Sequence, residues 1–244
     1  MNGFKKMLVT AIGAGFAQTL PAQTHHNIWF RTTVSYQVSE KVKADVELQH
    51  RRQNGFENDN MLDKNLMCSF RSWLHYQYNK HTGFSVSPFA YFTNYPIIQN
   101  VPGEPAKPFH EIRFAAAMDN RNKIMGKWGL LERSALEYRI PDNSIPRTLR
   151  LRSRLGLQYA ATSRLGLSVY DELFCNIAGV SASHFFDHNR IGLTFEYRIS
   201  PGMKLEAGYI YISRLPLAEG ILRREHNIMM NFTCQLKKRR GKLS

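Results

Sequence analysis

The sequence predicts an all-β fold: a small antiparallel transmembrane β-barrel of about 10–12 strands that follows an N-terminal signal peptide. Apolar and polar residues alternate along most of the 244 residues, which is the period of a strand with two different faces. The alternating segments are roughly 10–14 residues long, enough to cross a bilayer at a tilt and longer than most strands of globular sheets. Short turns and longer loops alternate between them, as in outer-membrane barrels.

The first 22 residues have the features of a secretory signal. Lys5 and Lys6 precede an apolar run over residues 7–17, and Ala22 ends a plausible cleavage site. We therefore expect a signal peptide, an outer-membrane β-barrel domain and a basic C-terminal tail at residues 1–22, 23–236 and 237–244. This organisation predicts an exported protein located in the bacterial outer membrane.

Eleven segments show the alternation, and each is bounded by turn or loop residues. In chain order they are residues 28–38, 41–51, 65–78, 81–93, 109–118, 128–140, 147–159, 164–174, 188–199, 203–213 and 226–236. The short joints are 39–40, 79–80, 119–127, 161–163 and 200–202, and the longer connections are 53–63, 94–108, 141–146, 176–187 and 214–224. With both termini in the periplasm the count should be even. Either one segment is miscounted or the first strand begins outside.

The clearest alternation lies in 41–51, 65–78, 147–159 and 188–199, and the other segments follow it more loosely. In 147–159, Arg150, Arg152 and Arg154 share one face, whereas a helix would scatter them. The apolar face of this segment and of 188–199 is expected to contact lipid through Leu149, Leu151, Leu155, Leu157, Ile191, Leu193 and Phe195.

The polar face is expected to form a lumenal charge ladder. Its members are Arg133, Glu137, Arg139, Arg150, Arg152, Arg154, Glu172, Arg190, Glu196 and Arg198. In a narrow barrel opposite charges can meet, so we expect ion pairs to pack the lumen shut. Basic residues outnumber acidic ones on this face, so an anion channel is the alternative.

Alternation alone does not distinguish a soluble sandwich or lipocalin-like barrel from a membrane barrel, because both have one apolar face. Long strands and charges in mid-strand favour the membrane barrel. So do aromatic residues near strand ends, where an interfacial girdle is expected: Tyr36, Tyr76, Tyr78, Phe92, Tyr138, Tyr159, Tyr197, Tyr209 and Tyr211.

Several segments carry a resemblance to a known family: WFRTTVSY at 29–36, SEKVK at 39–43, LRLRSRLGL at 149–157, ELF at 172–174, HNRIGL at 188–193 and FEYR at 195–198. They are similar to the domain-of-unknown-function 2490 family, exported outer-membrane barrel proteins found mainly in Bacteroidetes. The resemblance covers about residues 27–236. It implies the fold and the location but no activity, because the family has no established activity and these motifs are strand patterns.

Composition and motifs favour a role without catalysis. Mean hydropathy is −0.38, too polar for a bundle of membrane helices, and three separated cysteines exclude a disulfide framework. The loop 181–188 contains Ser, His and Asp, but a nucleophile and its base must lie about 3 Å apart on a rigid support. His110 is expected at the interface with lipid, and His25-His26 lack the further ligands of a metal site.

We therefore expect no catalytic, cofactor-binding or metal site. The net charge of +14 would suggest nucleic acid in a soluble protein, but an exported barrel rarely meets any. The expected partners are outer-membrane lipid and an unidentified envelope protein, and the expected function is structural or interactive. The alternatives are a small-solute or anion channel and, after it, an outer-membrane lipid-modifying enzyme.

Overall fold

The computed structural model describes residues 24–55, 59–98, 107–216 and 222–236. The signal peptide expected at 1–22 and the basic tail expected at 237–244 lie outside these residues. The strands are β1 (Thr24–Gln37), β2 (Val42–Gln53), β3 (Lys64–Gln77), β4 (Thr82–Asn94), β5 (Phe109–Met125), β6 (Trp128–Pro141), β7 (Thr148–Ala160), β8 (Leu165–Ala178), β9 (Phe186–Ser200), β10 (Met203–Arg214) and β11 (Arg223–Leu236), with one 3-10 turn, η1 (Ala182–His184), between β8 and β9. No helix in these ranges has the length and apolar content to cross a membrane.

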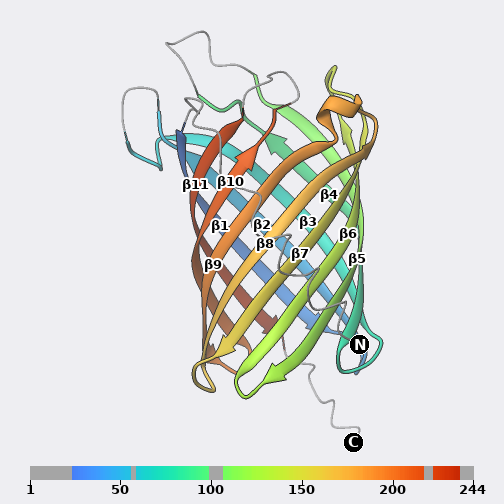
Figure 1. Cartoon of the computed structure of the whole chain (residues 1–244), viewed down its shortest axis with the longest axis vertical. Coiled ribbons are helices and arrows are strands. Elements are labelled where there is room, and N and C mark those ends of the chain that lie inside the picture. The colour runs from blue at the N-terminus through green and yellow to red at the C-terminus, as the bar shows by residue number, and fades with distance from the viewer. Residues whose placement is uncertain (1–23, 56–58, 99–106, 217–221, 237–244) are drawn as a thin grey trace, which may run out of the picture.

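The strands form one closed barrel in which each strand pairs with its neighbours in sequence (Figure 1). All ten sequential pairs are antiparallel, and β1 closes the barrel against β11 in parallel. The predicted all-β barrel is therefore confirmed, and a two-sheet sandwich is wrong.

The count of eleven strands explains the parallel closure. Eleven strands are joined by ten antiparallel steps, and after an even number of reversals the first and last strands run in the same direction. Because β1 leads into the short turn at residues 38–41, it must begin at the end of the barrel that carries the long connections. The expectation of an even number is wrong, and the explanation that the first strand begins at the loop end is correct.

One predicted joint is also wrong. Residues 119–127 were expected to form a turn, but β5 continues to Met125, and Asp119 to Lys123 pair with Arg133 to Gly129 of β6. Their polar side chains resemble turn residues, yet their backbone groups complete the ladder. The turn itself consists of Gly126 and Lys127, and the φ of 53° at Gly126 suits glycine.

The wall has an apolar outer face and a charged inner face. Leu48, Leu155 and Ile191 are about half exposed on the outside, at 56%, 50% and 48%, whereas Glu137 on the inside is 0% exposed. This is the reverse of a water-soluble barrel, whose apolar residues fill the interior.

Close packing on the inner wall requires glycine at two positions. Gly156, Tyr170 and Gly192 lie in one row across β7, β8 and β9. A Cβ atom at Gly156 would lie 2.9 Å from the Tyr170 Cβ, and one at Gly192 would lie 2.5 Å from the Tyr170 hydroxyl. The Tyr170 ring therefore lies over Gly192 along the wall, with the Arg154 guanidinium 4.3 Å from its centroid.

Candidate functional site in the barrel lumen

The lumen contains a cavity of about 290 Å³ lined by residues from all eleven strands. Ten of the lining side chains are basic and four are acidic. They meet there because alternate residues of each strand point inward. The basic members are Arg31, Arg51, Arg71, Arg113, Arg121, Arg150, Arg152, Arg154, Arg190 and Lys204, and the acidic members are Glu47, Glu137, Glu196 and Glu206.

The Glu137 carboxylate on β6 is the centre of an ion-pair network. Arg71 donates to it across the lumen at 3.0 Å, and Arg150 from the adjacent strand also donates to it. The guanidinium groups of Arg113 and Arg152 lie 3.6 Å and 3.8 Å away. One buried carboxylate therefore holds β3, β5 and β7 to β6.

The Glu172 carboxylate on β8 is a second centre. Arg152 and Arg154 each donate to it at 2.9 Å, and an Nη atom of Arg190 lies 3.7 Å from it. Arg152 contacts both Glu137 and Glu172, so it joins the two centres. Both carboxylates are almost fully buried, where an unpaired charge would be very unfavourable.

The network extends to the end of the barrel that carries the long connections. Glu111 accepts hydrogen bonds from Arg113 at 2.7 Å and from Arg139 at 2.5 Å. Further pairs join Arg150 to Asp187 at 2.6 Å, Asp187 to Arg214 at 3.9 Å and Arg214 to Glu225 at 2.6 Å. We call this connected set the arginine–carboxylate network: Arg71, Arg113, Arg139, Arg150, Arg152, Arg154, Arg190, Arg214, Glu111, Glu137, Glu172, Asp187 and Glu225.

Pairs near the short turns are smaller and more exposed. They join Arg31 to Glu47, Lys43 to Asp45, Arg133 to Asp119 and Lys204 to Glu196. This half of the lumen therefore contributes less cross-linking between distant strands.

Aromatic rings separate the guanidinium groups. Phe174 is 1% exposed and has the guanidinium carbons of Arg150, Arg152 and Arg190 at 5.1, 4.8 and 4.3 Å from its centroid. Arg113 lies 3.7 Å from the Phe92 ring. Each ring face attracts a cation without neutralising it.

The alternation of polar and apolar residues does not predict these inward rings, and the expectation that Phe92 belongs to the outer girdle is wrong. The cause is a register shift between Ser87 and Ala90 of β4, which moves the inward positions from odd to even numbers. For Phe174 the signal was present, because it lies two residues after Glu172 on the same face.

The structure places the predicted charge ladder as follows. Six members line the cavity, and Glu172 lies behind its lining with Arg152 and Arg154. Arg139 and Arg133 bind Glu111 and Asp119, whereas the Arg198 side chain is 64% exposed near the end of β9. Of the seven residues expected to face lipid, Leu149 is half-buried, and Leu151, Leu155, Leu157, Ile191, Leu193 and Phe195 are 37–50% exposed on the outer face.

The loop residues weighed for catalysis do not assemble into a triad. Ser181 and Ser183 lie 3.1 Å and 3.2 Å from the His184 Nδ1 on exposed η1. Asp187 instead binds Arg150 inside the barrel, where His188 stacks on Phe174 at 3.8 Å. No group of three or more potential metal ligands lies together within the described ranges.

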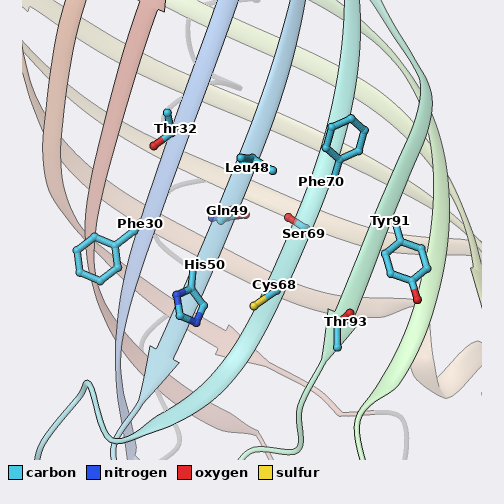
Figure 2. A pocket seen from close by; sticks show the side chains of 10 residues that line it. All are labelled: Phe30, Thr32, Leu48, Gln49, His50, Cys68, Ser69, Phe70, Tyr91 and Thr93. Atoms are coloured by element: carbon cyan, nitrogen blue, oxygen red, sulfur yellow. The ribbon is translucent and has the colours of Figure 1, made fainter.

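His110 lies on the outer face near a shallow hollow. Its Nδ1 is 3.1 Å from the Thr93 hydroxyl, and its ring stacks on Tyr91 at 5.5 Å. The hollow, of about 420 Å³, lies over β1 to β4 and is lined by Phe30, Thr32, Leu48, Gln49, His50, Cys68, Ser69, Phe70, Tyr91 and Thr93 (Figure 2). Its lining is mainly apolar and aromatic, in contrast to the lumen.

One family model matches most of the chain. The model of a family described as "Protein of unknown function (DUF2490)" matches residues 26–215. The matched range runs from β1 to the end of β10 and ends before β11. None of the curated proteins compared with the chain is significantly similar to it.

Replacing Glu137 tests whether the network supports the fold. We expect Glu137→Gln to lower the free energy of unfolding by about 3–5 kcal/mol, because four guanidinium groups lose their shared carboxylate. Denaturant unfolding of the protein in lipid vesicles, followed by tryptophan fluorescence, measures the change. Glu40→Gln, at an exposed turn position, should change stability by less than about 0.5 kcal/mol. Equal stability of Glu137→Gln and wild type would contradict the role of this carboxylate.

Proposed function

Because the chain belongs to the DUF2490 family, whose description assigns no function, we propose its role from its own structure. It is an outer-membrane β-barrel with a lumen closed by ion pairs, and it acts as a structural or interaction protein. One observation carries the proposal: the barrel is apolar outside and charged inside.

The apolar surface surrounds the whole barrel. Every strand exposes at least one large apolar side chain: Val34, Leu48, Phe70, Val86, Phe114, Leu136, Leu155, Val169, Leu193, Leu205 and Met230, on β1 to β11 in order. Soluble monomers rarely expose continuous apolar patches larger than a few hundred Å². A closed barrel satisfies its backbone hydrogen bonds internally, so such a surface is suited to lipid.

Aromatic side chains near the short turns also support a membrane location. Tyr36, Tyr76, Tyr78 and Tyr197 are 42–61% exposed close to the ends of β1, β3 and β9. Tyrosine is enriched where a membrane meets water. The short turns would then lie in the periplasm and the long connections outside the cell.

The blocked lumen supports a role without free diffusion through the barrel. Arg71 and Glu137 join across the lumen, and Phe92 and Phe174 lie among the guanidinium groups. Ten basic side chains point into this interior, so their charge is not available to nucleic acid outside the barrel. The separation of His184 from Asp187 supports a role without catalysis.

A polar interruption of the outer belt supports a protein partner in the envelope. Ser134 of β6 pairs with Ser153 of β7, and Asn189 of β9 lies two strands further along the same row. In the next row, Glu132 of β6 and Asp171 of β8 lie on either side of Leu155 of β7. Asn189 donates to Asp171 on this outer face. Polar groups that face lipid are unfavourable, so another protein is a better neighbour for this patch than acyl chains.

Anion passage is the second candidate function. It is favoured by the ten basic and four acidic side chains around the cavity, because rings of Arg and Lys select anions in pores. It would require the contacts across the lumen to open.

Cell fractionation tests the location. We expect the protein in outer-membrane fractions, with Gln23 as its first residue, because residues 1–22 have the order of a secretory signal. Immunoblots of separated membranes and mass spectrometry of the intact protein give both readouts. A cytosolic protein that retains Met1 would reject the location.

Leu193→Arg tests which face contacts lipid. Leu193 is 44% exposed at the middle of β9, and its neighbours across the strands are Val169 and Tyr209. We expect a loss of about 2–4 kcal/mol in unfolding free energy in lipid vesicles, the value for arginine near the bilayer centre. Leu62→Arg is the matched control, because Leu62 is exposed outside the strands and should tolerate the charge. Similar stability of both variants would show that Leu193 does not face lipid.

Conductance distinguishes the closed barrel from the channel. In planar bilayers we expect the wild-type protein to carry little current, because the network crosses the lumen. A steady, anion-selective current would contradict the closed lumen and support anion passage, with the lining arginines as the selective groups.

A further inference from the structure

Several arginines around the cavity have buried hydrogen-bond donors that no protein acceptor satisfies in the described part of the chain. Seven lining arginines each have a buried Nε–H with no acceptor within the described part of the chain: Arg51, Arg71, Arg113, Arg150, Arg152, Arg154 and Arg190. A buried donor without an acceptor costs about 1–3 kcal/mol, and more in a charged group. The carboxylates of the network accept no hydrogen bond from these seven Nε–H groups.

Arg51 is the least compensated of these groups. Its guanidinium carbon lies 3.6 Å from the centroid of the Trp29 ring, and one Nη donates to the Gln49 side chain at 3.3 Å. No carboxylate among the described residues lies within ion-pair distance of it. Neither the neutral amide of Gln49 nor the ring face of Trp29 neutralises the charge of Arg51.

Arg190 lies on the same side of the network. It is 5.6 Å from the Trp29 centroid and 4.3 Å from that of Phe174, and its nearest carboxylate, Glu172, is 3.7 Å away and already binds two other arginines. Arg51 and Arg190 therefore place two weakly compensated charges at one tryptophan beside the cavity. Like charges held this close repel each other unless an anion lies between them.

We propose that the lumenal cavity binds a small oxyanion with at least two negative charges, of the phosphate class, and that Arg51 and Arg190 are its main ligands. A guanidinium group presents paired N–H donors that match phosphate oxygens. The volume of about 290 Å³ accommodates a phosphate or a pyrophosphate. The excess of basic side chains in the lining selects a multivalent anion over chloride.

This inference goes beyond the proposed function and is independent of it. A barrel that conducts no ions can hold an anion, and the binding site is the same wherever in the cell the protein lies. Binding to purified protein and current across a bilayer are separate measurements, so either result can fail without the other.

Calorimetric titration of the detergent-solubilised protein with pyrophosphate tests the site. The buffer contains chloride at constant ionic strength, so that screening does not change during the titration. We expect one saturable site per chain, a rise in Tm with ligand, and a change in tryptophan fluorescence, because Trp29 contacts both arginines. Absence of saturable binding to the wild type would overturn the proposal.

Arg51→Met and Arg190→Met test the ligands. Each should weaken pyrophosphate binding about 10- to 100-fold, the effect of losing a hydrogen bond to a charged group. Neither leaves an unpaired acid among the described residues: Arg51 has no carboxylate partner there, and Glu172 keeps Arg152 and Arg154. The far-UV circular dichroism spectrum verifies that each variant folds.

Arg139→Met is the matched control. Arg139 is largely buried in the same network and binds Glu111, which keeps Arg113, but it does not line the cavity. Its replacement should leave the affinity unchanged. Equal weakening in all three variants would show a general effect of charge and reject the site. Unchanged affinity in Arg51→Met and Arg190→Met would reject these ligands.

Discussion

The Glu137 carboxylate meets guanidinium groups from three other strands in the middle of the barrel. Arg71 reaches it from β3, which lies three strands away around the wall, so this ion pair joins two non-adjacent parts of the wall through the interior. The arginines could not occupy a closed interior without such a partner, because an isolated buried charge is very unfavourable. Replacing the whole set by apolar residues could be neutral in stability, whereas removing one member is not. The network therefore acts as a unit.

The closure of the sheet determines which charges meet. Eleven strands make β1 and β11 parallel, and the sequential antiparallel pairs set the remaining registers. Within those registers Glu137 and Arg150 are direct neighbours, as are Arg154 and Glu172. The connection from Arg150 through Asp187 to Arg214 and Glu225 needs the long connections to bring the start of β9 beside β10. The dense half of the network accordingly lies at that end of the barrel.

The sequence predicted what depends on period two and on adjacent strands. Alternation identified the closed β-fold, and the segments with Arg150 to Arg154 and Glu172 became neighbouring strands. The prediction from alternation was wrong where the pairing of the strands is irregular. A register shift between Ser87 and Ala90 in β4 turns Phe92 inward. Alternation also could not predict the contact of Arg71 with Glu137, which are 66 residues apart, because that contact depends on strand number and stagger. The polar end of β5 resembles a turn in the sequence, because side-chain polarity does not show whether the backbone is paired.

The inward aromatic rings explain how so many arginines coexist in one interior. A ring face attracts a guanidinium group yet leaves its full charge, whereas a carboxylate cancels it. Phe174 lies among Arg150, Arg152 and Arg190, and Arg51 and Arg190 both lie near the Trp29 ring. Had closure been the only requirement, carboxylates in place of these rings would have neutralised the lumen. The rings instead hold the arginines in place while the cavity lining keeps its excess of positive charge. An anion-binding site needs that excess of charge, whereas a simple plug does not.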